Sequence, residues 1–159
     1  MDTTTTLHAF SLSGLTGGTI DFSAFKGKKV LIVNTASFCG YTPQYKQLKE
    51  LQEEFSNVLV VVGVPCNDFG NQEPDSDAEI AAFCERNFQV NFPMTTKVTI
   101  VGDAQHPLYQ WLTSAKLNGV QDAEVKWNFH KFLIDENGHL MADFPSSVSP
   151  VSEDIINLL

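Results

Sequence analysis

The chain has 159 residues, a formal net charge of −9 and a single arginine, Arg86. This length fits one domain spanning 1–159, and a hydrophobic content of 43% is enough for a buried core. Clustered Lys and Arg are what bind nucleic acids and anionic membranes, so the acidic balance argues against both as partners.

The first residues carry neither the basic nor the apolar stretch of a secretory signal. The longest apolar run, 58–64, is too short to span a bilayer. Three cysteines, Cys39, Cys66 and Cys84, are a poor disulfide framework for a secreted protein and favour a reducing compartment. We therefore expect a cytoplasmic protein without stable membrane association.

The first half of the chain predicts a small hairpin followed by a βαβ unit. Segments 10–12 and 19–21 form the hairpin around a Gly-Gly turn. Continuous β-branched runs at 30–33 and 58–62 predict strands buried on both faces. Apolar residues at helical spacing lie between them, and Thr42-Pro43 supplies an N-cap and a proline for the first helical position. The crossover between two such strands is right-handed in nearly all proteins.

The second half predicts further helices and an antiparallel strand pair. Ser76 to Glu79 fits a capping box at the start of a second helix, and a third begins near Pro107. The remaining predicted elements are a strand at 129–134, an Asn-Gly turn, a strand at 140–142 and a closing helix from 150 or 152 to 159. This order matches a thioredoxin-like α/β fold, with a central mixed sheet flanked by helices and a leading N-terminal hairpin.

Cys39 is the strongest candidate for a chemically active side chain. It follows a buried strand and precedes a helix, where backbone N–H groups and the helix dipole favour an anion, and the thiolate is the nucleophilic form. Its neighbours 40–43 are loop and cap residues, which favours a reactive over an inert buried thiol. Thr42 stands where a Cys-x-x-Cys oxidoreductase has its second cysteine, and Ala36 stands where a peroxiredoxin motif has threonine.

Three separated motifs resemble the signatures of the glutathione peroxidase family. They read NTASFCGYT at 34–42, PCNDFGNQEP at 65–74 and WNFHKF at 127–132. Their order and spacing match the family across nearly the whole chain. The resemblance implies a thioredoxin fold and an enzyme that reduces hydrogen peroxide or organic hydroperoxides.

Carried over position by position, the resemblance makes Cys39 the residue that attacks peroxide, with Gln72, Trp127 and Asn128 completing a catalytic tetrad. Amide and indole N–H groups can hold the sulfur anion and the peroxide oxygens, a role like that of an oxyanion hole. Attack would leave Cys39 as a sulfenic acid. Taken singly, these residues could equally be a turn residue, a core aromatic and a strand-edge cap.

Cys84 resembles the resolving cysteine of the two-cysteine, thioredoxin-using branch of the family. That implies a Cys39–Cys84 disulfide that thioredoxin reduces by exchange. The spacing of Ile80, Cys84 and Phe88 also predicts that Cys84 faces the core as a small hydrophobe. A disulfide needs Cα atoms within about 7 Å, so its formation would require local rearrangement. Cys66 is expected to be structural.

The reductant expected from the charge pattern is thioredoxin, because glutathione is anionic and this chain has one arginine. Asp143-Phe144 stands where many resembling proteins carry Arg-Tyr, which weakens glutathione further. The short segment 112–125 lacks the insertion of tetrameric relatives, so a monomer is expected. No cofactor or metal is expected, since the histidines and cysteines show no ligand spacing.

Three alternatives remain open on the sequence. The same cysteines could form a peroxide sensor that passes its disulfide to a partner protein. The chain could be a glutathione-dependent peroxidase that uses one cysteine. A thioredoxin-fold binding module without catalysis is the third, although it would predict disrupted signature positions, and Cys39, Gln72, Trp127 and Asn128 are all present.

Overall fold

The computed structural model describes the chain except for residues 1–4, 38, 72, 74 and 75. A four-stranded mixed sheet with the strand order β4-β3-β5-β6 forms its centre. The strands are β3 (Lys29–Thr35), β4 (Leu59–Pro65), β5 (Lys131–Ile134) and β6 (Leu140–Phe144). β3 runs parallel to β4 and antiparallel to β5, and β5 pairs antiparallel with β6.

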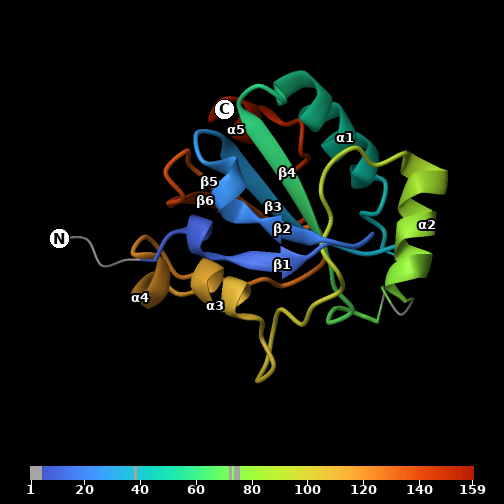
Figure 1. Ribbon diagram of the computed structural model, residues 1–159, viewed down its shortest axis with the longest axis horizontal. Coiled ribbons are helices and arrows are strands. Elements are labelled where there is room, and N and C mark those ends of the chain that lie inside the picture. Colours follow the sequence, from blue (N-terminus) through green and yellow to red (C-terminus); the bar gives the residue numbers. More distant parts are fainter. Residues whose placement is uncertain (1–4, 38, 72, 74–75) are drawn as a thin grey trace.

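Helices cover both faces of this sheet (Figure 1). One face packs against α1 (Gln44–Phe55), α2 (Asp77–Phe88) and the short α5 (Glu153–Ile156). The other face packs against α3 (Pro107–Thr113), next to which lies α4 (Ala115–Asn118). Two 3-10 turns, Leu7–Ala9 and Phe22–Phe25, and the hairpin of β1 (Ser11–Ser13) and β2 (Thr19–Asp21) complete the described elements.

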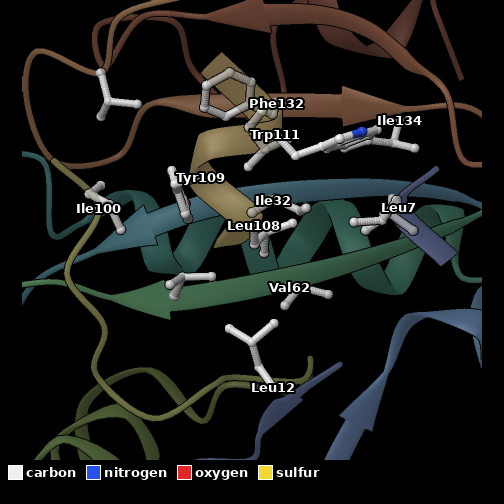
Figure 2. Packing of buried hydrophobic residues seen from close by; sticks show 14 of the residues in the cluster. Leu7, Leu12, Ile32, Val62, Ile100, Leu108, Tyr109, Trp111, Phe132 and Ile134 are labelled. Atoms are coloured by element: carbon white, nitrogen blue, oxygen red, sulfur yellow. The ribbon is translucent and has the colours of Figure 1, made fainter. Parts of the chain in front are cut away.

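The core is divided by the sheet into two apolar clusters. Side chains of β3 alternate between them, with Leu31 and Val33 in one and Ile32 in the other. In Figure 2, Ile32 lies with Val62 and Phe132 among side chains that come from α3 and the N-terminal segment. Because both faces are covered, the central strands are uninterrupted apolar runs rather than alternating ones.

The predicted architecture is confirmed, including the leading hairpin, the parallel pair β3–β4 and the antiparallel pair β5–β6. The capping box is also confirmed, since the Ser76 hydroxyl accepts the Glu79 N–H at 3.3 Å at the start of α2. Proline occupies the first turn of α3 as predicted. No helix in the described part of the chain is long and apolar enough to cross a membrane.

Several boundaries differ from the prediction, two of them for identifiable reasons. Thr42 does not cap α1, because its hydroxyl is bonded within the preceding loop, and the helix starts at Gln44 with Pro43 as its N-cap. The strand predicted at 129–134 begins at Lys131, since Phe129 has a φ of 66°. The closing helix is a single turn, and α4 was not predicted.

Candidate active site

Cys39 lies in the loop that connects β3 to α1, and its exposed fraction is 7%. The Tyr41 N–H donates a hydrogen bond to the Cys39 sulfur at 3.4 Å. The Thr42 hydroxyl accepts from the Cys39 N–H at 2.9 Å and donates to the Ala36 carbonyl at 2.8 Å. The loop is thus braced on both sides of Cys39, with a backbone donor aimed at the sulfur.

The segment 127–130 is bonded to the end of β3 through Asn34. The Asn34 side chain donates to the Trp127 carbonyl at 3.1 Å and accepts from the His130 N–H at 3.0 Å, while its own carbonyl accepts from the Phe129 N–H at 2.6 Å. The φ of Phe129, 66°, is one that bulky residues seldom adopt. Asn34 therefore supports a strained turn next to the strand that leads to Cys39.

Trp127 and Asn128 connect this segment to the second sequence motif. The Asn128 side chain donates to the Phe69 carbonyl at 3.4 Å, and the rings of Trp127 and Phe69 are 6.1 Å apart. Trp127 also packs against the apolar cluster that contains Cys39. Residues from all three motifs therefore gather beyond the carboxyl ends of β3 and β4, where open α/β sheets place their sites. Gln72, the other predicted tetrad member, lies outside the described residues.

Cys84 is buried in α2 and faces the core, as its spacing predicts, with an exposed fraction of 3%. It belongs to the same apolar cluster as Cys39, and both are free thiols. Burial raises the pKa of the Cys84 thiol to about 11; the neighbouring Tyr45 hydroxyl lowers it and the Glu73 carboxylate raises it. In this conformation Cys84 is protonated at neutral pH and is a poor nucleophile.

Cys66 has the surroundings of a structural cysteine. It is fully buried in the second motif and accepts the Asp68 N–H at 3.3 Å. Burial raises the pKa of its thiol to about 12. These surroundings favour an inert thiol.

A cavity of about 700 Å³ opens beside Trp127, and residues that sequence reasoning did not single out as functional line part of its wall. His130 Nε2 and Asp143 Oδ2 are 2.7 Å apart at this wall. Burial lowers the pKa of His130, an effect that Asp143 opposes. Tyr41 lines the cavity as well. Pairing of β5 with β6 brings this His and Asp together. His130 lies in the third motif and Asp143 was noted for its charge, but no local pattern predicted their contact.

Lys131 is a second buried ionisable residue that the sequence analysis missed. Its side chain is fully buried and donates to the carbonyls of Ser146 and Val148. Burial lowers the pKa of this lysine to about 7. Ser146 lines the cavity, so Lys131 holds part of the cavity wall. A lysine inside a predicted buried strand was the signal available in the sequence.

Comparison with known proteins gives consistent matches over most of the chain. A family profile described as "Glutathione peroxidase" matches residues 7–113. The chain is 46% identical to the glutathione peroxidase homolog BsaA of Halalkalibacterium halodurans, over 96% of this chain and 99% of that protein. It is 45% identical to the glutathione peroxidase-like peroxiredoxin gpx1 of Schizosaccharomyces pombe, over 90% of this chain and 92% of that protein.

Solved structures agree with the fold. The apo crystal structure of Trgpx superposes with a TM-score of 0.73 and 36% identity, over 96% of this chain and 94% of that one. A thioredoxin family thiol:disulfide interchange protein from Chlorobium tepidum has a TM-score of 0.65 and 15% identity, over 99% of this chain and 97% of that one. The second likeness concerns the fold alone, and it confirms the predicted thioredoxin-like architecture.

Proposed function

The chain belongs to the glutathione peroxidase family, and from this premise we propose that it reduces hydrogen peroxide and organic hydroperoxides through Cys39, with thioredoxin as its reductant. The observation that carries the assignment of Cys39 is its braced loop. A backbone N–H is aimed at the sulfur, and the Trp127–Asn128 segment is bonded to the strand from which the loop emerges. Gln72, Trp127 and Asn128 are the proposed partners of Cys39 in the tetrad.

In the first step the Cys39 thiolate attacks one peroxide oxygen. A sulfur–oxygen bond forms as the O–O bond breaks, and the departing oxygen takes up a proton to leave as water or an alcohol. Cys39 is thereby oxidised to the sulfenic acid. The N–H groups around the sulfur stabilise the charge that moves from sulfur to the leaving oxygen.

In the second step Cys84 attacks the Cys39 sulfenic acid. A disulfide forms between the two sulfurs. The hydroxyl of the sulfenic acid leaves as water after taking up the proton of the Cys84 thiol. A reduced thioredoxin then reduces this disulfide by thiol–disulfide exchange, and its own two thiols become a disulfide. Cys84 is buried in α2 and its pKa is about 11, so we propose that α2 opens locally before this attack.

Thioredoxin is proposed over glutathione because of charge. The chain has a net charge of −9, and its one arginine, Arg86, lies on α2 rather than at the cavity beside Trp127. That cavity presents the carboxylates of Glu124 and Asp143 and one lysine, Lys126, so acidic groups outnumber basic ones there. We further propose that the protein works as a monomer in the reducing environment of the cytoplasm, where thioredoxin keeps thiols reduced.

The test is peroxide consumption with hydrogen peroxide and cumene hydroperoxide. Each substrate is supplied in parallel with thioredoxin plus its reductase and with glutathione plus its reductase. The variants are Cys39→Ser and Cys84→Ser, and Cys66→Ser is the matched control, because it removes a buried thiol outside the proposed mechanism. We expect activity with thioredoxin that Cys39→Ser and Cys84→Ser abolish and Cys66→Ser retains.

The other outcomes separate the alternatives. Activity with glutathione that survives Cys84→Ser would contradict the resolving role and indicate a one-cysteine peroxidase. Rapid oxidation of Cys39 by peroxide, without turnover by either reductant, would instead favour a sensor that passes its disulfide to a partner protein.

A further inference from the structure

The cavity of about 700 Å³ lies next to the proposed reaction centre. Tyr41 and Trp127 both line it, and the Tyr41 N–H is bonded to the Cys39 sulfur. Together with Pro145, these rings give the cavity apolar surface. A volume of this size accommodates a small organic molecule. A hydroperoxide whose O–O bond is presented to Cys39 therefore has space here for its organic group.

Asp143 is held in the wall of this cavity by two hydrogen bonds. Its Oδ2 is 2.7 Å from His130 Nε2, and its Oδ1 accepts from Gln121 Nε2 at 2.7 Å. The Asp143 side chain has an exposed fraction of 26%, and that of His130 only 7%. Because both oxygens are engaged, the carboxylate is fixed in orientation rather than free to turn into solvent.

When the charged side chains that line the cavity are counted, Asp143 is left with no opposite charge to offset it. Glu124 and Lys126 line it with opposite charges that offset one another. His130 does not neutralise Asp143 at physiological pH, because burial lowers the pKa of its imidazole. Neighbouring Lys131 acts on His130 in the same direction. Like charges repel one another, so a second anion close to Asp143 is disfavoured.

We propose that this cavity receives the organic group of the substrate and that the fixed Asp143 carboxylate makes the site select uncharged hydroperoxides over those that carry a carboxylate. The preferred class is then hydrogen peroxide, alkyl and aryl hydroperoxides and esterified lipid hydroperoxides, and the disfavoured class is free fatty-acid hydroperoxides. This inference rests on the proposed peroxidase function and names the substrate class of the same site.

The test compares two matched substrates, cumene hydroperoxide with a para-carboxylate and the methyl ester of the same compound. We expect kcat/KM for the ester to exceed that for the acid by about tenfold in the wild type, equivalent to one charge repulsion of about 1.4 kcal/mol. Asp143→Asn keeps the size and planar shape of the side chain but removes its charge and one of its two acceptor oxygens. It is expected to bring the ratio close to one. Asp103→Asn removes an exposed carboxylate that does not line the cavity, and it should leave the ratio unchanged.

Ionic strength supplies a measurement that needs no variant. The ester-to-acid ratio of the wild type should fall as salt is raised, because salt screens a partly exposed charge. A wild-type ratio near one, or equal effects of Asp143→Asn and Asp103→Asn, overturns the inference while peroxidase activity with hydrogen peroxide stands. Absence of turnover with hydrogen peroxide itself overturns the proposed function, and the inference falls with it.

Discussion

Asn34 shows how a single buried residue can hold the two halves of the site together. It lies near the end of β3 with no solvent exposure, and its side chain and carbonyl make three hydrogen bonds to the segment 127–130. Burying an amide is costly unless its donors and acceptors are satisfied, so these bonds also specify where that segment lies. We therefore regard Asn34 as a positioning residue for Trp127 and Asn128.

We predict that Asn34→Ala lowers kcat/KM for hydrogen peroxide by about tenfold to a hundredfold, because small displacements of reacting groups have effects of that size. Asn34→Asp keeps the acceptor for the His130 N–H and loses the donor to the Trp127 carbonyl. Its activity should therefore lie between that of the wild type and that of Asn34→Ala. Fluorescence of Trp127, measured in a Trp111→Phe background, should shift in both variants.

Asn118→Ala is the matched control for this prediction. Asn118 is also buried, and it donates to the carbonyl of the other tryptophan, Trp111, at 2.7 Å. Its loss should lower stability without moving the Trp127 fluorescence or the activity of the folded protein. If both alanine variants changed activity equally, the positioning role of Asn34 would be wrong.

Among the elements, α2 is the one that the proposed mechanism requires to move. Only Ile80 and Cys84 are fully buried on this helix, and a cavity of about 1030 Å³ lies along it, lined in part by Cys84. The helix ends at Phe88, and its C-cap Gln89 is a non-glycine residue with a φ of 48°. Few buried contacts and a strained end are features of an element that opens at low cost.

We predict that one equivalent of hydrogen peroxide opens α2 by forming the Cys39–Cys84 disulfide. Amide hydrogen exchange in 77–88 should accelerate at least about tenfold on oxidation, and the change should be absent in Cys84→Ser. Exchange in α3, on the opposite face of the sheet, should stay the same and serves as the internal control. Disulfide formation with unchanged protection of α2 would contradict this prediction.

At the scale of the whole molecule, Lys131 couples folding to pH. It is fully buried in β5 and donates to the carbonyls of Ser146 and Val148, and Gln44 of α1 donates to the same Ser146 carbonyl at 2.8 Å. The lysine thus connects the centre of the sheet to the segment that follows β6. Burial lowers its pKa from 10.5 to about 7, so protonation of the folded protein is disfavoured.

The predicted consequence is a free energy of unfolding that rises with pH between about 7 and 8.5. In that range the unfolded chain keeps the Lys131 proton and the folded chain releases it, so stability increases by up to about 1.4 kcal/mol per pH unit. Urea unfolding of Lys131→Met should lack this rise, whereas Lys46→Met, at an exposed position of α1, should retain it. The range stops near 8.5 because ionisation of cysteines in the unfolded chain lowers stability at higher pH. Equal slopes in wild type and Lys131→Met would show that this lysine does not titrate on folding.

Much of this protein could be predicted from short stretches of sequence. The apolar runs predicted β3 and β4, the Ser76 capping box predicted the start of α2, and three short motifs together predicted the family. Each of these signals is contained within about ten neighbouring residues, since periodicity, caps and turns act over that range. The fold class followed from their order along the chain.

Tertiary structure alone decided how the site is held and what surrounds it. The bond between Asn34 and His130 joins residues 96 positions apart, and Asp143 meets His130 only because β6 is bonded to β5 in this register. Thr42, predicted as a helix cap, braces the Cys39 loop instead, because buried acceptors and donors of that loop outcompete the helix end. Such contacts depend on the register and packing of distant segments, which a local pattern does not encode.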